Sequence, residues 1–397
     1  MRDVPHLRFP EFSGEWEEHT LSEYLEFKNG LNPDAKRIGN GLPFISVMDI
    51  LSEGVINYDN IRGKVDATDK EIECFGVKDG DLLFQRSSET LEDVGRANVY
   101  MDNRIAIYGG FVIRGRKIGN YDPLFFKYLL ATPLARKRTR RMGAGAQHFN
   151  IGQEGLSKIS LYFPSIEEQR KIAGFLSLID KRIATQNKII EKLESLIKGL
   201  SQRLLSPKQG WTSYKLDELC QIKSGYSGIQ VSFQTAYKVS RIETISNHCI
   251  NMSRIGFVKE IPQEYKLRVG DILFSNINSV QYIGNTAFID KDYGLYHGMN
   301  LLRIVPDSRM VFPRFIHLLL CSERLLRHFQ SICNKAVSQA SINQTSLGKT
   351  MMTIPSYKEQ QHICCIIESV ERKLDIETSL LKMLQYQKQY LLRQMFI

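Results

Sequence analysis

Long apolar runs are missing from this sequence, although 43% of its 397 residues are hydrophobic. No window approaches the roughly 18 uncharged apolar residues that a membrane-spanning helix needs. The N-terminal stretch MRDVPHLRFPEFSGEW also has no apolar core of a targeting segment. We therefore expect no contact with a membrane.

Cysteine is present but lacks any framework pattern. The seven cysteines are an odd number, and Cys364 and Cys365 are adjacent within an apolar helical pattern. No Cys-x-x-Cys or His-x-x-x-His spacing indicates a metal site. Free thiols in the reducing cytoplasm, with no bound metal, are the expectation.

Catalytic motifs are also missing. The tripeptide Gly348-Lys349-Thr350 resembles the end of a phosphate-binding loop, but that loop needs a glycine where Asn343 stands. The sequence shows no glycine-rich dinucleotide loop after a strand, no Asn-Pro-Pro-aromatic signature of a base methylase and no convincing paired-carboxylate nuclease motif. These absences predict a chain that binds no cofactor and catalyses no reaction by itself.

An internal repeat with an offset of about 191 residues is the main positive signal. Glu167–Leu205 and Lys358–Phe396 superimpose at that offset, after FPSIEEQ in one half and IPSYKEQ in the other. Upstream, both halves contain a strand-like run (43–50 and 237–245), a Gly-Asp strand from Gly80 or Gly270, and a helix (122–141 and 312–332). Only two copies exist, so the pattern indicates a duplicated domain.

This order predicts an α+β fold with two similar mixed α/β domains separated by two long helices. The expected parts are a first domain over 1–165, a central helix over 166–206, a second domain over 207–356 and a C-terminal helix over 357–397.

Aliphatic residues at alternating steps of three and four run along both predicted helices. In the first helix this seam comprises Ile172, Leu176, Ile179, Ile183, Gln186, Ile190, Leu193, Ile197, Leu200 and Leu204. In the second it comprises Ile363, Ile367, Val370, Leu374, Glu377, Leu381, Leu384, Lys388, Leu391 and Met395. Such a seam is typical of a coiled coil, and we expect the two helices to pair antiparallel. The alternative is that each helix packs on its own domain.

The polar residues Gln186 and Glu377 interrupt the seam at equivalent places. In an antiparallel pair they would approach each other and fix the register. Ile172 to Leu204 spans about 48 Å as a helix, which matches roughly 14 base pairs of B-DNA. The helices could therefore space two recognition sites on one duplex.

Positive charge is concentrated in one region of each half. The chain carries a net charge of +10, and residues 114–150 hold nine Arg and Lys residues against one Asp. The same region of the second half, 305–350, holds six against two. This pattern favours a nucleic-acid partner. The expected DNA-binding residues here are Arg136, Lys137, Arg138, Arg140, Arg141, Gln147, Arg327, Lys335 and Gln339.

Polar residues that can read base edges follow the duplicated Gly-Asp strands. They are Gln85, Arg86 and Ser87 in the first half, and Asn276, Asn278 and Gln281 in the second. Arginine suits guanine, and asparagine or glutamine suits adenine, by bidentate hydrogen bonding. Ordinary surface residues or turn formers are the alternative for each position.

Together, LRFPEF before Trp16, the paired Gly-Asp strands, the FPSIEEQRKIAGFL and IPSYKEQQHICCII segments and the two long helices resemble the specificity subunit of type I restriction–modification enzymes. The resemblance implies two target-recognition domains, each reading half of a bipartite, gapped site in double-stranded DNA. It also implies a helical spacer that docks two methyltransferase subunits, with restriction subunits in the full complex. S-adenosylmethionine, ATP and Mg²⁺ would then belong to those partners.

The second copy departs from the first at one place, since Gln361 and His362 replace Arg170 and Lys171. The equivalence of the two docking surfaces is therefore left open. Two other functions also stay open: a coiled-coil scaffold without DNA recognition and an orphan component of a modification system.

Overall fold

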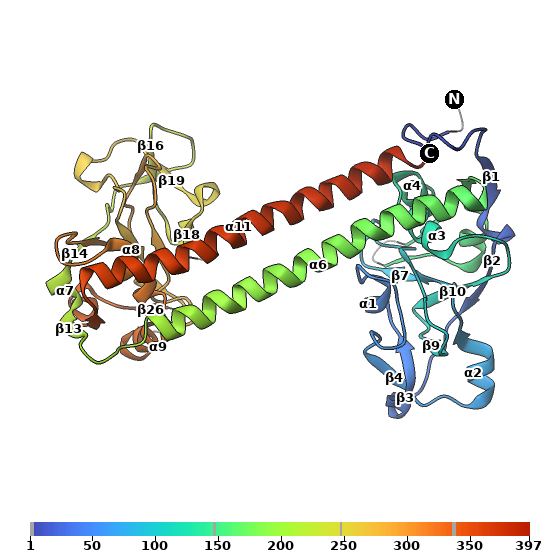
Figure 1. Cartoon of the computed structure of the whole chain (residues 1–397), viewed down its shortest axis with the longest axis horizontal. Helices are drawn as coiled ribbons and strands as arrows, with labels where there is room; N and C mark the ends of the chain where they lie inside the picture. The colour runs from blue at the N-terminus through green and yellow to red at the C-terminus, as the bar shows by residue number, and fades with distance from the viewer. Residues whose placement is uncertain (1–3, 146–147, 247, 336–338) are drawn as a thin grey trace. The chain divides into compact units, whose positions relative to one another are not determined.

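A computed structural model describes residues 4–145, 148–246, 248–335 and 339–397. The chain divides into two compact units (Figure 1). Unit 1 comprises Met1–Lys188 with Thr378–Ile397, and unit 2 comprises Ile189–Glu377. Each unit therefore contains one copy of the repeat together with part of both long helices.

Unit 1 is built on two four-stranded sheets. The first is antiparallel, in the order β2 (Leu25–Asn29), β10 (Val112–Lys117), β6 (Leu82–Gln85) and β8 (Ala97–Val99). The second runs β4 (Gly63–Val65), β3 (Ile38–Ile45), β9 (Ala106–Tyr108) and β5 (Gly76–Val77), with β3 and β9 parallel. Two ladders complete it: β1 (Glu17–Thr20) with β12 (Ser160–Phe163), and β7 (Ser87–Ser88) with β11 (Phe149–Asn150).

Unit 2 repeats this plan. Its antiparallel sheet runs β14 (Cys220–Ser224), β24 (Leu302–Pro306), β20 (Ile272–Phe274) and β22 (Thr286–Phe288). Its mixed sheet runs β15 (Gln230–Val231), β19 (Gly256–Val258), β16 (Tyr237–Val239) and β23 (Leu295–Tyr296). The smaller ladders join β13 (Thr212–Lys215) to β27 (Met351–Ile354), β17 (Ile245–Ser246) to β18 (Cys249–Ile250), and β21 (Ile277–Asn278) through β26 (Ala340–Ser341) to β25 (Asn334–Lys335).

Short helices connect the strands. In unit 1 they are η1 (Leu21–Glu23), η2 (Ala35–Arg37), α1 (Val47–Ile50), α2 (Asp69–Phe75), α3 (Pro123–Leu130), α4 (Pro133–Met142) and α5 (Gln153–Ser157). In unit 2 they are α7 (Leu216–Leu219), η3 (Ile242–Thr244), η4 (Met252–Arg254), η5 (Gln263–Tyr265), α8 (Pro313–Leu320), α9 (Glu323–Ile332) and α10 (Gln344–Gly348).

Two sequence predictions about these segments were wrong. The single helix expected over 122–141 is split into α3 and α4, because Pro133 has no N–H to continue the first helix and the Thr132 hydroxyl accepts from Ala135 N to start the second. Ser322 starts α9 in the same way by accepting from Leu325 N. The strand-like runs over 43–50 and 237–245 likewise turn into the helical segments α1 and η3 after Ile45 and Val239.

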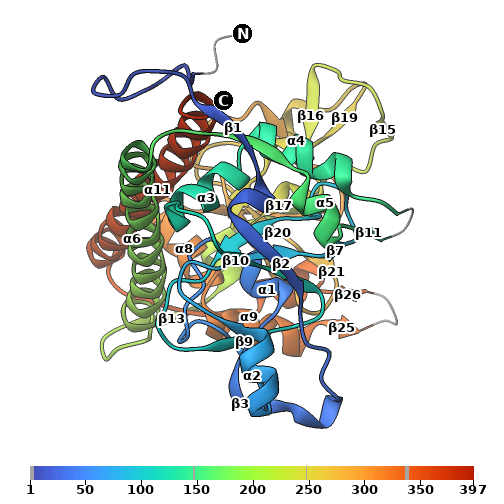
Figure 2. The same cartoon turned by 90° about the vertical axis from the view of Figure 1, so that its right-hand side faces the viewer.

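The two long helices are confirmed as α6 (Ile166–Leu204) and α11 (Tyr357–Gln394). In unit 1, α6 begins and α11 ends, so their segments lie antiparallel and side by side (Figure 2), with Lys388 Nζ 2.6 Å from Asp180 Oδ1. Every residue of the seam is buried or half-buried, and Gln186 and Glu377 are among the buried ones. The approach of these two polar residues to each other stays a prediction.

The core of unit 1 includes the end of α11. The Trp16 ring lies 6.0 Å from Phe125 and 6.2 Å from Phe396, measured between ring centroids. Leu391, Leu392 and Met395 are buried in the same cluster as Ile172 and Leu176 of α6. In unit 2, Ile363 and Ile367 of α11 belong to the core that contains Phe315. Each long helix is therefore stabilised both by packing against its domain and by burial of its seam.

Candidate nucleic-acid interface

In unit 1 the end of strand β6 lies against the loop that follows the basic helix α4. Ser87 and Ser88 of β7 pair with Asn150 and Phe149 of β11. Ala144 and Asn150 exchange two backbone hydrogen bonds of 3.0 and 2.9 Å, which close the loop into a hairpin. We call residues 85–88, 144, 145 and 148–150 the hairpin face of unit 1. It unites strand-end and loop residues that sequence analysis treated separately.

Unit 2 has the equivalent arrangement. Ile277 and Asn278 of β21 pair with Ser341 and Ala340 of β26, which in turn pair with Asn334 and Lys335 of β25. We call residues 275–281, 334, 335 and 339–341 the hairpin face of unit 2. The same non-local pairing thus brings Asn278 beside a loop that carries Lys335 and Gln339 in the sequence.

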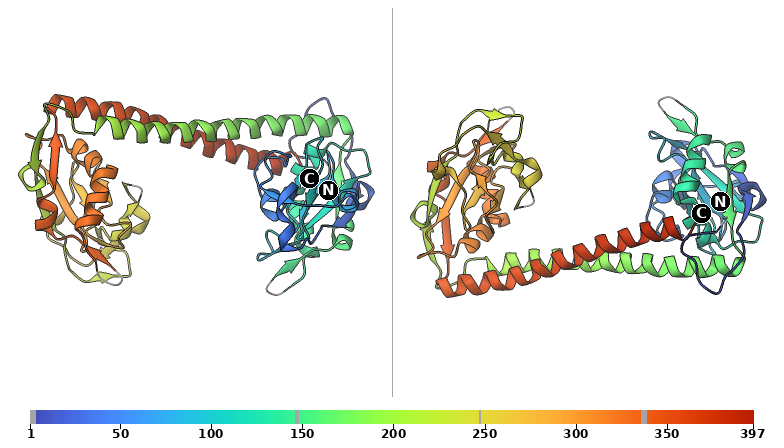
Figure 3. Two further views of the ribbon diagram at one scale, coloured as in Figure 1. Left: turned by 90° about the horizontal axis from the view of Figure 1, so that it is seen from below. Right: turned by 90° about the horizontal axis from the view of Figure 1, so that it is seen from above.

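The hairpin face of unit 1 and the long helix occupy different sides of that unit. Strands β7 and β11 lie on the side facing away from α6 (Figures 2 and 3). A ligand could therefore contact this face without competing with the packing of α6 against the unit.

The basic run on α4 divides into exposed and internally bonded cations. Lys137, Arg140 and Arg141 are exposed. Arg136 donates from Nη2 to Glu92 O at 2.8 Å and Val94 O at 2.7 Å, and burial lowers its pKa to about 10. Arg138 lies 2.7 Å from Glu18 Oε1 and also donates to Ser160. Three of the five predicted cations are thus available to an external anion, while two already stabilise the unit.

The strand-end residues of unit 1 are only partly accessible. Gln85 is buried at 4% exposure and donates from Nε2 to Ser87 O at 3.0 Å. Its Oε1 has no hydrogen-bond partner among the described residues. Arg86 is half-buried, with Nη1 3.4 Å from Gly110 O. Gln85 therefore shapes the base of the face, and Arg86 and Ser87 present polar atoms closer to solvent.

The predicted residues of unit 2 also differ in their exposure to solvent. Asn276 is half-buried and donates from Nδ2 to Ile342 O at 3.3 Å, whereas Gln281, Lys335 and Gln339 are exposed. Arg327 on α9 is exposed and forms an ion pair with Glu323 one turn earlier. Gln147, predicted with this group, lies outside the described residues. The structure thus locates the other predicted residues, and their contact with DNA stays a prediction.

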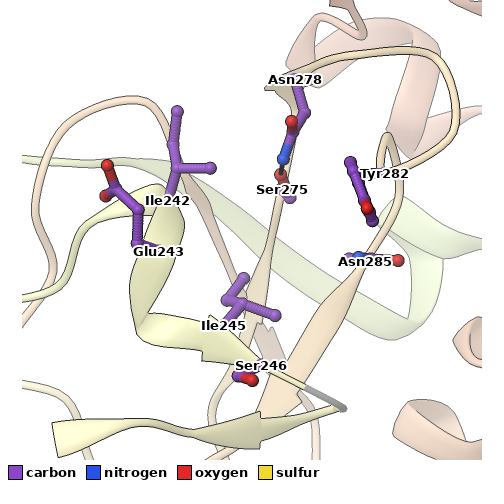
Figure 4. Close-up of a pocket in the computed structure, with 8 residues that line it drawn as sticks. All are labelled: Ile242, Glu243, Ile245, Ser246, Ser275, Asn278, Tyr282 and Asn285. Atoms are coloured by element: carbon purple, nitrogen blue, oxygen red, sulfur yellow. Dashed lines mark hydrogen bonds between the residues drawn. The ribbon is translucent and has the colours of Figure 1, made fainter. Parts of the chain in front are cut away.

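Sequence reasoning missed several side chains near these faces. Phe111 is 68% exposed at the turn before β10, and its carbonyl accepts from Arg86 N at 2.9 Å. In unit 2, Glu243 and Asn285 were missed, and they line a hollow of about 310 Å³ together with the predicted Asn278 (Figure 4). The preceding Gly109-Gly110 pair could have drawn attention to Phe111, but no local pattern connects Glu243 with Asn285.

Membrane spans and metal clusters are both absent from the described residues. No helix there is long and apolar enough to cross a membrane. Within the same residues, no group of three or more His, Cys, Asp or Glu side chains is arranged to hold a metal ion.

Comparison with known families decides the identity of the duplicated domain. Residues 13–195 and 208–386 each match the type I restriction modification DNA specificity domain. The chain belongs to this family. The two matched stretches correspond to the two copies of the repeat, and each match includes most of the long helix at the end of its copy.

Known relatives align with different fractions of this specificity-domain chain. A Methanocaldococcus jannaschii protein assigned as the MjaX specificity subunit of a type I restriction enzyme is 32% identical over 194 residues, which cover 47% of this chain and 46% of that protein. The match therefore spans about half of that relative. The type I restriction enzyme MjaVIII specificity subunit of the same organism is 22% identical over 95% of this chain and 90% of its own length.

The fold of the specificity-domain chain is also found among solved structures. The crystal structure of the type I restriction–modification system S subunit from M. genitalium matches with a TM-score of 0.61 and 16% identity, over 99% of both chains. A structure from a study of complex assembly and conformational transition in the type I system matches with a TM-score of 0.59 over 95% of this chain and 96% of that one. The similarity in fold extends over both repeats and both long helices.

Proposed function

We propose that this chain is the sequence-specificity subunit of a type I restriction–modification system. Each repeat would read one half of a bipartite, gapped site in double-stranded DNA. The observation that carries this proposal is the hairpin face, which recurs in both units on the same strand framework with different side chains. A repeated framework with different polar groups is suited to reading two different half-sites.

The chemistry of the faces supports DNA as the ligand. Lys137, Arg140 and Arg141 are exposed cations that can neutralise phosphates, and such contacts position a protein on the duplex. Asn278 and Gln281 are amides that can form hydrogen bonds to base edges. A scaffold that binds no nucleic acid has no need for exposed cations in unit 1 or for these amides in unit 2.

The long helices would set the gap and dock two methyltransferase subunits. An α-helix of 39 residues, such as α6, is about 58 Å long, so its length can fix the number of unread base pairs. Methylation would be catalysed by those partners with S-adenosylmethionine, and cleavage by restriction subunits with ATP and Mg²⁺. The chain itself would act in the cytoplasm without catalysing a reaction.

Mapping of methylated bases in the native host tests this function. Deleting the gene should remove one bipartite methylation motif, and restoring it should return the same motif. Replacing residues 1–165 by the corresponding part of another specificity subunit should change only one half of that motif. An unchanged methylation pattern after deletion would contradict the proposal.

Binding by the purified full-length chain provides a separate test. Affinity for duplex DNA should fall steeply as the salt concentration rises, because phosphate contacts release counterions. A response that is flat with salt would favour the scaffold function.

A further inference from the structure

The hollow in unit 2 lies between two segments that are distant in the sequence. Glu243 and Ile245 come from η3 and the start of β17. The other group comes from the segment between β20 and β22 and comprises Ser275, Asn278 of β21, Tyr282 and Asn285. Figure 4 shows the two segments on opposite sides of the open space, with Ile242 and Ile245 bordering it and the Glu243 side chain at the outer edge. Asn278 also belongs to the hairpin face, so the hollow adjoins that face.

Some polar groups of the hollow are hydrogen-bonded within the unit, and others can bond to a ligand. Asn278 is fixed, because it donates from Nδ2 to Ser275 Oγ at 3.1 Å and accepts from Ser279 N at 2.8 Å. The Asn285 carboxamide has no hydrogen bond to any other described residue. The Glu243 side chain is 57% exposed, with its Oε2 3.6 Å from Arg241 Nε. An available amide and an exposed carboxylate therefore remain at the mouth.

Unit 1 has the same backbone framework with different side chains. Ser275 N donates to Asn285 O and Gly284 N to Ser275 O, and in unit 1 Gln85 N donates to Arg96 O and Gly95 N to Gln85 O. Gly95 and Gly284 both have positive φ, at +66° and +84°, a backbone conformation that favours glycine. Ser275 and Asn285 thus occupy the positions of Gln85 and Arg96.

The carboxylate position also has a counterpart. Glu243 stands four residues after Val239, where β16 ends, and Asp49 stands four residues after Ile45, where β3 ends. Asp49 Oδ2 accepts from Ser46 N at 2.7 Å and from Ser46 Oγ at 2.8 Å. An exposed carboxylate in unit 2 therefore stands where unit 1 has a carboxylate that is already bonded at the start of α1.

A carboxylate beside DNA is repelled by phosphates. The nearby Arg241 reduces this repulsion for Glu243, and a hydrogen-bond donor on a base edge would stabilise the carboxylate further. In the major groove those donors are the N6 amino group of adenine and the N4 amino group of cytosine. An amide next to the carboxylate can donate to adenine N7, which lies beside N6. Glu243 and Asn285 thus suit an amine-bearing base, whereas unit 1 has Arg96, which suits guanine, and a carboxylate already bonded to Ser46.

We propose that the hollow of unit 2 receives the edge of one base pair in the major groove, where Glu243 accepts a hydrogen bond from the exocyclic amino group of adenine or cytosine and Asn285 forms the adjacent hydrogen bond. The proposal rests on the proposed DNA-reading function. It assigns one position of one half-site to two named side chains, and it predicts that unit 1 reads a different base at the corresponding position.

The test replaces the gene in its native host by E243Q or N285A, with all partner subunits present, and maps the methylated motif. E243Q should relax the preference for adenine or cytosine about tenfold at one position of one half-site, since a glutamine amide also donates. The other half-site and the gap should not change. E260Q is the matched control, because Glu260 is also exposed in unit 2 and does not line the hollow.

Duplexes made from the mapped site distinguish the two bases. Replacing adenine by hypoxanthine, or cytosine by uracil, removes the amino group. One of these changes should weaken binding by the purified wild-type chain about tenfold and binding by E243Q clearly less. If E243Q abolishes methylation in the host, this binding assay still tests whether Glu243 contacts the amino group.

Two outcomes would overturn the inference: an unchanged motif in both E243Q and N285A, or equal sensitivity of wild type and E243Q to removal of the amino group. Neither would contradict the DNA-reading function, provided that gene deletion removes the motif. A deletion that leaves methylation unchanged would instead contradict that function.

Discussion

Gln169 and Gln360, 191 residues apart, form the same two hydrogen bonds in their respective units. Gln169 Oε1 accepts from Asp122 N at 3.1 Å and its Nε2 donates to Pro164 O at 3.0 Å. Gln360 Oε1 accepts from Phe312 N at 2.9 Å and its Nε2 donates to Pro355 O at 3.0 Å. Each glutamine therefore fixes the first turn of a long helix to the start of α3 or α8.

Removing either glutamine should destabilise one unit selectively. Q169A and Q360A each leave a part-buried backbone N–H without its acceptor and a buried proline carbonyl without its donor, which we expect to cost about 1–3 kcal/mol. Urea unfolding measures this destabilisation, with Trp16 fluorescence reporting unit 1 and Trp211 reporting unit 2. Q202A is the control, because Gln202 is exposed and its side chain has one hydrogen bond among the described residues, to Glu323 at 3.4 Å. Equal stability of Q169A and Q202A would contradict this role.

The cations of α4 should separate into DNA-binding and structural groups. R140Q/R141Q should keep the stability of unit 1 but weaken binding to random duplexes, and reduce the salt slope by about 0.9 for each phosphate that is no longer neutralised. R138Q should instead lower stability, because Arg138 bonds to Glu18 and Ser160. K70Q on α2, which lies at the other end of unit 1 from α4 in Figure 1, serves as the charge control.

Acid should destabilise unit 2 more than unit 1. Burial lowers the pKa of His297 to about 4, and its Nε2 lies 2.9 Å from Leu301 O. An unfolded histidine titrates near pH 6.5. As the pH falls, the unfolded state therefore binds a proton at a higher pH than the folded state does. The free energy of unfolding of unit 2 is highest above pH 6.5 and falls by about 3 kcal/mol as the pH approaches 4.

Urea midpoints between pH 7 and 4.5 measure this acid destabilisation in W16F, where Trp211 remains as the reporter. Burial also lowers the pKa of His248 and His317, so their contributions have the same sign. H297Q should reduce the acid destabilisation. Unit 1 has His6, His19 and His148, none of them buried, and an equal acid response in both units would refute the prediction.

Asp180 should hold the end of α11 to unit 1. It accepts from Tyr128 OH at 2.8 Å and pairs with Lys388 Nζ at 2.6 Å. D180N weakens both interactions, which we expect to cost about 1–2 kcal/mol in unit 1. Trp16 fluorescence in urea measures this cost, because Trp16 packs on Phe396 beyond the end of α11. E191Q, an exposed change on α6, should have no comparable effect.

The predictions that succeeded depend on local periodicity and on the repeat. Ile172, Leu176, Ile179 and Ile183 are spaced at three and four residues, and all four are buried. The long helices therefore begin at their expected first residues, and α6 and α11 end two and three residues before their expected last residues. The helix expected over 122–141 was wrong because a single cap at Thr132 outweighed the continuous helical pattern around it.

The sequence by itself determined the duplication, the two seam-bearing helices and the concentration of positive charge, because each is a property of neighbouring residues or of two copies compared in register. Only the tertiary structure decided that Arg138 is bonded within the unit while Arg140 is exposed, and that Glu243 lies across a hollow from Asn285. Those relationships come from pairing between distant strands. Strand pairing is fixed by the packing of the whole unit, and it leaves no spacing in the sequence to detect.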